Sequence, residues 1–343
     1  MTELVATTPG LYPLPDWAKE DLADLKGHQK EDLVSGDEGE DVREAYDRAR
    51  AEVVGDQTDA GLDRVVEGQL RWDDMLAHPL CVHPNVETGG IVRYYDNNNF
   101  YRDPSVVGEL TPSGDVATEL EAARDLLGEE AGSLQAVLPG PYSLASLATD
   151  EQYGDETEFL AAVAEFLAGE VAAFPEHATL FLLDPSLVTD PPSEEGDLDE
   201  RAGEAVDRVA AATDAEVVVH SYWGALGEKL YAHLMDADVD GFGVDLLHER
   251  DASLYNLDEY GTRDVLAAGV VDGQNTLVES AETVADRVDW LDERTTATFD
   301  RVYATSNTEL FYLPTSVYRD KLVALADGVA LSRERAASTE VES

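Results

Sequence analysis

Residues 216–245 read EVVVHSYWGALGEKLYAHLMDADVDGFGVD. A run of three valines ends at His220, a stretch with helical spacing of its apolar residues runs from Gly224 to Met235, and a second apolar run ends at Asp245. Short apolar runs bounded by polar residues are typical of buried parallel strands, and an amphipathic stretch between them is typical of a crossover helix. The segment therefore predicts one β-α-β unit.

The same alternation continues on both sides of this unit. Further apolar runs lie at 134–138, 178–183, 267–271 and 301–305, with helical patterns at 156–173, 198–212, 276–291 and 315–331, and two earlier strands are expected at 3–8 and 62–66. Consecutive β-then-α units favour a parallel sheet with right-handed crossovers. Eight strands are the number in a (β/α)8 TIM barrel, so we predict that α/β fold. An open doubly wound sheet is the alternative.

Three segments exceed what a minimal barrel needs. We expect residues 1–335 to form a single barrel domain with insertions at about 30–58, 88–115 and 186–200. The first is polar and acidic with helical spacing, the second is rich in Gly, Asn and Tyr and predicts an inserted hairpin, and the third is a Pro-rich acidic loop. Residues 336–343 are expected to form a frayed tail.

The composition is strongly acidic. The 343 residues include 23 Lys+Arg and 73 Asp+Glu, for a net charge of −50, yet 43% of them are hydrophobic, which argues against a disordered chain. This charge repels nucleic acids and anionic membranes, and it is typical of a protein from a very salty cytoplasm. The start of the sequence predicts no signal peptide, so we expect a soluble, cytoplasmic protein.

Cysteine occurs only once in the chain. Cys81 is the single cysteine, so neither an internal disulfide nor a zinc site with two Cys ligands can form within the chain. Cys81 and His83 have the spacing of a metal-ligand pair, although a C-x-H pair alone is a weak signal. The sequence contains no P-loop, no G-x-G-x-x-G after a strand and no G-x-S-x-G.

Polar residues follow the predicted strands. The carboxyl ends of barrel strands meet at one face, so we expect a ligand pocket there. The candidates at strand ends are Gln69, Asp184, His220, Asp245, Asp272, Asn307 and Glu309. The alternative is that the Asp and Asn side chains cap the helices that follow. His220, after three valines, fits a metal ligand, an acid–base group or a hydrogen-bonded structural residue.

The expected hairpin carries an aromatic cluster. Its members are Tyr94, Tyr95, Phe100 and Tyr101, with Arg93 and Arg102. They would either cover a flat ligand or pack against the barrel or a partner.

With these residues placed, the chain resembles the cobalamin-independent methionine synthase family. These are zinc methyltransferases whose barrel is shared with uroporphyrinogen decarboxylase. The similar stretches, in order, are TTPGLYP (7–13), AGLD (60–63) through EGQLRWDDM (67–75), AVLPGPY (136–142), LLDP (182–185), HSYWG (220–224), GVVDGQN (269–275), and 306–314 followed by Lys321-Leu322. The resemblance implies methyl transfer to homocysteine in methionine biosynthesis. It adds Gly10, Trp72, Asp74 and Tyr222 to the pocket candidates.

The departures from the family pattern concern the metal. The family holds zinc with the His and Cys of H-x-C, a Glu after the next strand and a Cys in the last motif. Here His220 persists and Asp245 stands at the Glu position, whereas Tyr222 and about Thr308 stand at the Cys positions. Tyr and Thr do not replace soft thiolate ligands, so we expect no metal or cofactor on this chain. At positions that contact homocysteine, Leu11, Gln69 and Leu183 replace Ser, Glu and Asp.

In the long form of the family, a metal-free N-terminal barrel faces a zinc-bearing C-terminal barrel, and this chain looks like the metal-free barrel alone. The resemblance therefore implies a partner barrel that carries zinc, a small-molecule substrate, and a methyl donor of folate or corrinoid type. Two alternatives remain. One is a self-sufficient methyltransferase whose metal site is rebuilt from His220 and Asp245 with Cys81 or Glu309. The other is a non-catalytic ligand-binding barrel.

The net charge of −50 predicts that stability depends on salt. Self-repulsion destabilises the compact state when charges are unscreened, and the Debye length falls from about 10 Å at 0.1 M to about 3 Å at 1 M. We expect the melting temperature to rise steeply over that range in a thermal-melt series. A melting temperature that stays constant would contradict an adaptation to high salt.

Overall fold

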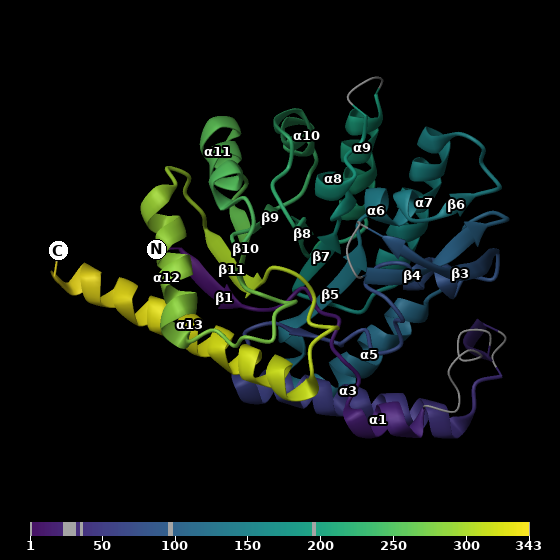
Figure 1. Ribbon diagram of the computed structural model, residues 1–343, viewed down its shortest axis with the longest axis horizontal. Coiled ribbons are helices and arrows are strands. Elements are labelled where there is room, and N and C mark those ends of the chain that lie inside the picture. Colours follow the sequence, from purple (N-terminus) through teal and green to yellow (C-terminus); the bar gives the residue numbers. More distant parts are fainter. Residues whose placement is uncertain (1, 23–31, 35–36, 95–98, 194–196, 343) are drawn as a thin grey trace.

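The computed structural model describes residues 2–22, 32–34, 37–94, 99–193 and 197–342. Eight parallel strands form one curled sheet in the order β1-β11-β10-β9-β8-β7-β5-β2 (Figure 1). Their bounds are β1 (Glu3–Ala6), β2 (Val65–Val66), β5 (Leu134–Pro139), β7 (Thr179–Leu183), β8 (Glu216–His220), β9 (Gly241–Asp245), β10 (Val265–Val271) and β11 (Arg301–Ser306). Leaving aside the strands of a separate small sheet, neighbours in the large sheet follow one another in the sequence, except that the first strand, β1, pairs with the last, β11. A doubly wound sheet reverses its order at a central strand, so that alternative is wrong.

The two edge strands, β1 and β2, do not pair with each other in the described chain, so the sheet stops short of a complete barrel. Instead, the backbone amides of Asp63 and Arg64 donate to the carbonyl of Ala6 at 2.9 and 3.3 Å. The Asp63 side chain also accepts from the Ala6 amide at 2.7 Å, where a strand carbonyl would otherwise accept. The number, order and direction of the strands match the prediction, and only the last pairing of the ring differs.

The strands are buried on both faces. Every residue of β5, β7, β9 and β10 is buried. Such strands need helices over the outer face and side chains that fill the inner face, which explains their unbroken apolar runs.

Helices lie on the outside of the curled sheet (Figure 1). They are α1 (Asp16–Asp21), α3 (Glu40–Ala60), α4 (His78–Cys81), α5 (Asp115–Leu127), α6 (Pro141–Ser146), α7 (Glu156–Val171), α8 (Ser186–Thr189), α9 (Leu198–Ala210), α10 (Glu228–Leu234), α11 (Arg250–Tyr260), α12 (Ala281–Arg294) and α13 (Thr315–Glu342), with a 3-10 turn at Gly128–Ser133. Asp155 and Ser280 cap α7 and α12 through their side chains. None of the described helices has the length and apolar character needed to cross a membrane.

The segments expected as insertions take three forms. Helix α3 falls within the first, and residues 23–31 and 35–36 lie outside the described chain. In the second, β3 (Val86–Tyr94) and β4 (Asn99–Val106) form an antiparallel hairpin, and β4 also pairs with β6 (Thr149–Asp150). The third contains the short helix α8 and the start of α9.

The tail differs from the expectation of a frayed end. Helix α13 continues to Glu342, and its end extends past the sheet in Figure 1. Its sequence is rich in Ala, Glu and Arg, which favour helix. Arg335 also binds Asp286 and Asp289 of α12 at 3.0 and 2.6 Å, which fixes the helix near its end.

The packing predicts unequal costs for two glycine substitutions. Gly140 and Gly227 precede α6 and α10 with nearly the same backbone (φ −68°, ψ 151° and φ −62°, ψ 145°). A Cβ on Gly140 would overlap the side chain of Asp184, whereas a Cβ on Gly227 would meet nothing within 4 Å. We expect Gly140→Ala to lower the free energy of unfolding by about 1–3 kcal/mol, the usual cost of overpacking.

Gly227→Ala is the matched control and should change the free energy of unfolding by less than about 1 kcal/mol. Chemical denaturation of both variants in the same salt measures the difference. Equal stabilities would show that the β5 and β7 ends are not packed as described.

Candidate functional site

Three strand ends share one buried polar network. His220 ends β8, Asp245 ends β9, and Asn307 follows β11. Nε2 of His220 lies 2.8 Å from the carbonyl oxygen of Asn307, and Nδ2 of Asn307 donates to Asp245 at 3.1 Å. The three residues are at most 1% exposed. The structure therefore brings together three of the candidates that sequence reasoning placed at strand ends.

The carboxylate of Asp245 is saturated with donors. Its oxygens accept from the amides of Trp223 (3.0 Å), Leu247 (2.9 Å) and His248 (3.2 Å). They also accept from Nδ1 of His248 (2.9 Å) and Nδ2 of Asn307 (3.1 Å). Carboxylate oxygens offer about four lone-pair sites, so five donors leave no capacity for a metal ion. Asp245 holds the loops after β8, β9 and β11 in place.

His220 is bound on one side and closed in on the other. A carbonyl only accepts, so Nε2 carries the proton that it donates to Asn307, and Nδ1 holds the lone pair. Nδ1 packs against Gly243 so closely that a Cβ on Gly243 would overlap it. Burial lowers the pKa of His220, which keeps the ring neutral. The structural alternative for this histidine fits these contacts, and Nδ1 has no hydrogen-bond partner among the described residues.

A second pair lies beside the network. The Tyr222 hydroxyl donates to Oε1 of Glu309 at 2.7 Å, and both side chains are at most 1% exposed. Burial raises the pKa of Glu309 to about 8, although the Tyr222 hydrogen bond opposes the shift. Oε2 of Glu309 has no hydrogen-bond partner among the described residues. Thr308 Oγ1 bonds the Glu309 carbonyl at 3.3 Å.

Asp184 and Asp272 act locally. Asp184 accepts from the Ser143 amide (2.7 Å) and hydroxyl (2.5 Å) at the start of α6, and burial raises its pKa to about 7. Asp272 accepts from the amides of Gln274 and Asn275 in the turn after β10. Asp184 therefore caps α6, the helix that precedes its strand, whereas Asp272 closes a turn and is not the cap of α12, which is Ser280.

The candidates after β1 and β2 also serve local structure. Oε1 of Gln69 accepts from the Leu11 amide at 2.6 Å, and Gly10 lies against the same side chain. Asp74 accepts from the amides of Leu76 and Ala77 at the start of α4. Trp72 stacks on His78, with ring centroids 5.3 Å apart.

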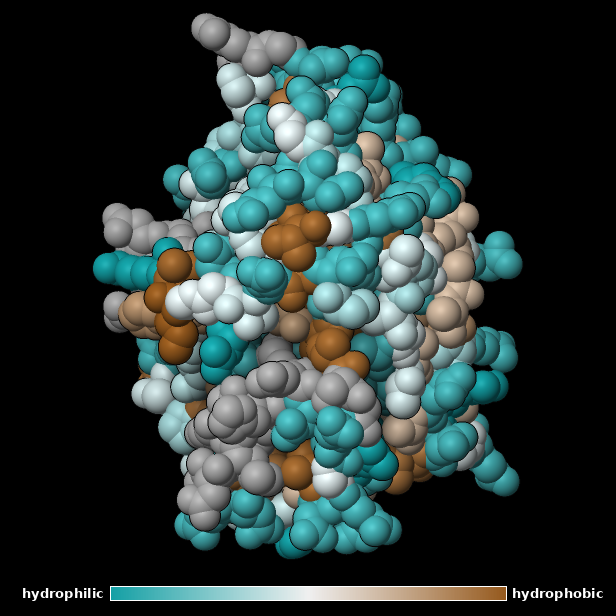
Figure 2. All heavy atoms as spheres, turned by 90° about the vertical axis from the view of Figure 1, so that its right-hand side faces the viewer, coloured by the Kyte–Doolittle hydropathy of each residue, from teal (hydrophilic) through white to brown (hydrophobic). Residues whose placement is uncertain are grey.

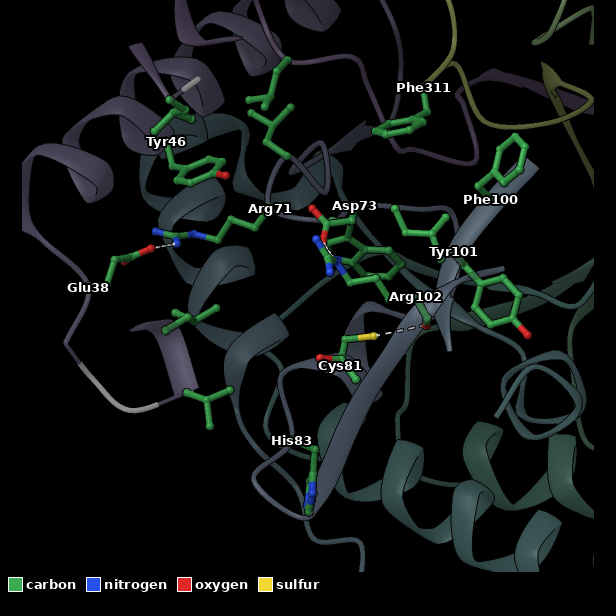
Figure 3. Close-up of a pocket in the computed structure, with 18 of the residues that line it drawn as sticks. Glu38, Tyr46, Arg71, Asp73, Cys81, His83, Phe100, Tyr101, Arg102 and Phe311 are labelled. Atoms are coloured by element: carbon green, nitrogen blue, oxygen red, sulfur yellow. Dashed lines mark hydrogen bonds and ion pairs between the residues drawn. The ribbon is translucent and has the colours of Figure 1, made fainter. Parts of the chain in front are cut away.

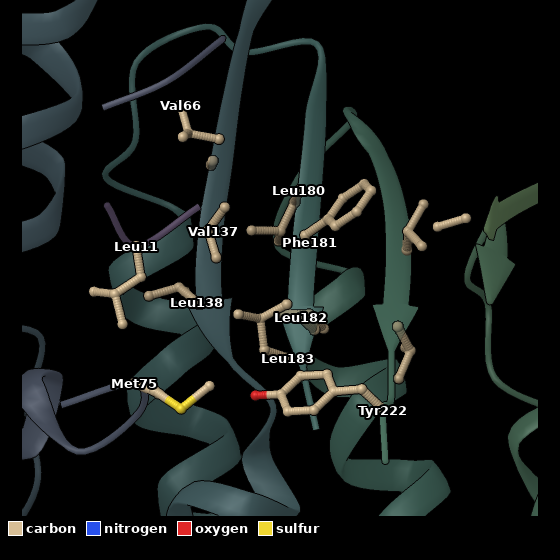
Figure 4. Close-up of a cluster of buried hydrophobic side chains, with 14 of the residues drawn as sticks. Leu11, Val66, Met75, Val137, Leu138, Leu180, Phe181, Leu182, Leu183 and Tyr222 are labelled. Atoms are coloured by element: carbon tan, nitrogen blue, oxygen red, sulfur yellow. The ribbon is translucent and has the colours of Figure 1, made fainter. Parts of the chain in front are cut away.

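The centre of the sheet at the strand ends is filled by apolar side chains. Leu11, Met75, Leu183 and Tyr222 are each at most 1% exposed and belong to the main core cluster (Figure 4). Leu11, Leu183 and Tyr222 are three of the positions where the sequence departs from its family pattern. The departures therefore place core residues where the expected pocket would open.

A cavity of about 770 Å³ lies to one side, between the β3–β4 hairpin and the segments after β1 and β2. Its described lining is Pro13, Leu14, Lys19, Leu22, Leu33, Val34, Glu38, Tyr46, Leu70, Arg71, Trp72, Asp73, Cys81, His83, Pro84, Val86, Thr88, Ile91, Phe100, Tyr101, Arg102 and Phe311 (Figure 3). Figure 2 shows hydrophobic side chains gathered in a hollow on this face of the molecule. Of the pocket candidates, only Trp72 lines the cavity.

The aromatic hairpin gave the signal for this cavity. Phe100, Tyr101 and Arg102 line it as part of the predicted cluster, and Arg93 is exposed on β3. Tyr95 and the side chain of Tyr94 lie outside the described chain. Sequence reasoning missed Glu38, Tyr46 and Arg71, because no pattern shows that α3 and the loop after β2 face the hairpin.

Cys81 and His83 do not form a metal-ligand pair. Nδ1 of His83 accepts from the Asn85 amide at 3.0 Å, and Nε2 donates to the Thr111 carbonyl at 3.0 Å. Both ring nitrogens are thus held by backbone. The Cys81 thiol lies 3.8 Å from the Arg102 carbonyl.

Comparisons with known proteins identify a family and several related chains. A family model described as the N-terminal domain of cobalamin-independent synthase matches residues 83–296. Methionine synthase from Saccharolobus islandicus (strain L.S.2.15) is 25% identical over 334 residues, which are 96% of this chain and 95% of the relative. The corresponding protein of Sulfolobus acidocaldarius is 24% identical over 337 residues, 97% of this chain and 94% of the relative.

Solved structures show the same fold. A B12-independent methionine synthase from Shewanella sp. W3-18-1, in complex with selenomethionine, superposes with a TM-score of 0.78 at 20% identity and covers 97% of this chain and 98% of its own. A putative vitamin-B12 independent methionine synthase from Listeria monocytogenes has a TM-score of 0.71 at 17% identity, with the same coverage.

The buried Glu309 predicts a pH-dependent stability. Its pKa is about 8 in the folded chain, against about 4.3 for an unfolded Glu, so the folded state binds more protons between these values. The free energy of unfolding should therefore fall as pH rises from about 4.5 to 8. Glu309→Gln keeps an acceptor for Tyr222 but does not titrate, so its stability should fall less over this window and exceed that of the wild type at pH 8.

Denaturant unfolding at several pH values measures this difference, with the exposed Glu293→Gln as the matched control. If Glu309→Gln and Glu293→Gln both run parallel to the wild type, the Glu309 carboxyl does not have the assigned environment.

Proposed function

This chain belongs to the cobalamin-independent methionine synthase family, and from that membership we propose that it is a barrel subunit of a methionine-forming methyltransferase. In this proposal, a separate partner barrel carries the zinc that activates homocysteine, and the methyl donor is of folate or corrinoid type. The chain supports the reaction without holding the metal itself.

The donor atoms at the ligand positions support this division of labour. Tyr222 and Thr308 offer hydroxyl oxygens in place of thiolates, and both are engaged in hydrogen bonds. Asp245 already accepts from five donors. Nε2 of His220 is engaged by the Asn307 carbonyl, and its unpaired Nδ1 is buried against Gly243. These residues do not fit a zinc ion, so no step of the reaction is assigned to a metal on this chain.

The packing of core side chains at the carboxyl ends of the strands is the observation that carries the proposal. Leu11, Met75, Leu183 and Tyr222 are part of the core at the strand ends, while the strands and turns of the family architecture remain. A homocysteine thiol needs a metal or a base to become a nucleophile at neutral pH. A barrel that keeps its architecture but has neither metal ligands nor an open central pocket is suited to assist a second barrel.

Two other functions have different support. A self-sufficient enzyme with a metal site rebuilt from His220 and Asp245 would need Cys81 or Glu309 as a further ligand. Cys81 lies under the hairpin against Arg102 and lines the lateral cavity, and Oε1 of Glu309 already accepts from Tyr222. A non-catalytic ligand-binding barrel is favoured by that cavity, whose volume of about 770 Å³ is within the range of small-molecule sites.

A reconstituted methylation assay tests the subunit proposal. The partner should be a barrel from the same cell that carries an H-x-C motif, a Glu and a further Cys. We expect homocysteine methylation by the partner to require this chain, or to fall at least about tenfold without it, and the two to co-purify in high salt. An unrelated protein of similar net charge is the control for non-specific stabilisation. Full activity of the partner alone, without co-purification, would contradict the subunit role.

A further inference from the structure

The guanidinium of Arg71 lines the lateral cavity and is fixed by contacts with neighbouring side chains. Arg71 follows β2, and its side chain is only 9% exposed although it lines the cavity. Its Nε lies 3.1 Å from Oε1 of Glu119 on α5, and its guanidinium carbon lies 4.4 Å from the ring centroid of Tyr46 on α3. These contacts fix the direction of a planar fork that suits carboxylates.

A carboxylate of the chain itself occupies that fork. Glu38, two residues before α3, forms an ion pair with Nη1 of Arg71 and lies 3.4 Å from Nε of Arg43 (Figure 3). The Glu38 side chain is 5% exposed and also lines the cavity. The pair is therefore built as a guanidinium–carboxylate contact at the wall of a space large enough for a small molecule.

The cavity differs in charge from the rest of the molecule. The chain carries −50, yet the described lining holds the cations Lys19, Arg71 and Arg102 against the two carboxylates Glu38 and Asp73. Arg102 pairs with Asp73 at 3.3 Å, and both are at least 36% exposed, so solvent weakens that pair. Arg71 is the better anion receptor because it is shielded from water.

Flat side chains surround these charges. Tyr46, Trp72, Phe100, Tyr101 and Phe311 line the same cavity. Trp72 is fixed by stacking on His78, which in turn lies 2.8 Å from Asp115 of α5. Aromatic walls favour a planar ligand.

We propose that this cavity binds a flat ligand bearing a carboxylate, that Arg71 receives the carboxylate, and that Glu38 competes with the ligand for the same guanidinium. The competition is an exchange. Buried Arg50 and Arg71 already face Glu38 and Glu119, so a further buried negative charge requires one carboxylate to leave. This inference concerns the cavity alone and does not depend on the proposed partner barrel.

Binding of 2-naphthoate, compared with its neutral isostere 2-naphthamide, tests the inference on the full chain. The chain's single cysteine lines the cavity, so protection of Cys81 from iodoacetamide reports occupancy, and calorimetry in the same salt gives the affinity. We expect 2-naphthoate to bind about tenfold more tightly than 2-naphthamide and to protect Cys81, because a hydrogen bond between charged groups is stronger than one to a neutral amide.

Three variants separate recognition from folding. Glu38→Gln removes the competitor and should tighten 2-naphthoate binding about fivefold without changing the affinity for 2-naphthamide. The exposed Glu44→Gln on α3 is the matched control and should change neither. Arg71→Lys keeps the charge but loses the fork, and should weaken 2-naphthoate binding about tenfold while the affinity for 2-naphthamide, which reports a folded cavity, stays unchanged.

The inference is overturned if neither probe protects Cys81, if the two probes bind equally, or if Glu38→Gln leaves the affinity for 2-naphthoate unchanged. Each outcome is independent of the methylation assay, which tests the partner barrel rather than the cavity.

Discussion

The carboxylate of Asp245 is the constraint on which the carboxyl end of the sheet depends. It accepts five hydrogen bonds from Trp223, Leu247, His248 and Asn307, and so joins the segments that follow β8, β9 and β11. The Asn307 side chain in turn accepts from the Gly273 amide after β10, and the Asn307 backbone carbonyl accepts from Nε2 of His220. A buried carboxylate is stable only when its oxygens are satisfied, and here the backbone of the loops satisfies them. The same hydrogen bonds fill the lone-pair sites of the Asp245 carboxylate and engage Nε2 of His220.

Tyr222, Leu11 and Leu183 complete the core at the strand ends. The Tyr222 hydroxyl donates to Glu309 at the strand ends, and Leu11 and Leu183 belong to the same core cluster as Tyr222. A thiolate pair replaced by polar residues alone would leave unsatisfied groups in a buried space, which is costly. This packing fits the proposal that the chain acts without a metal of its own.

Strand positions and strand ends were predictable from the sequence because burial on both faces leaves unbroken apolar runs, as in β8 and β10. Helices α5 and α11 were not predicted, and α10 begins at Glu228 rather than Gly224 because Gly227 is its N-cap. The polar residues at strand ends were identified from the sequence, which left both a ligand pocket and local structural roles open for them. Whether a carboxylate caps a helix or lines a pocket depends on contacts between segments far apart in the sequence. The pairing of Arg71 with Glu38 and Glu119 is of this kind.

The central claim is that the strand ends of this barrel are a structural network rather than a metal site. The zinc content of the purified chain, measured by elemental analysis after gel filtration from zinc-supplemented buffer, tests it most directly. The account predicts well under one zinc per chain, with no further loss in a folded His220→Ala variant. Stoichiometric zinc that disappears in His220→Ala would contradict it and would establish a rebuilt metal site.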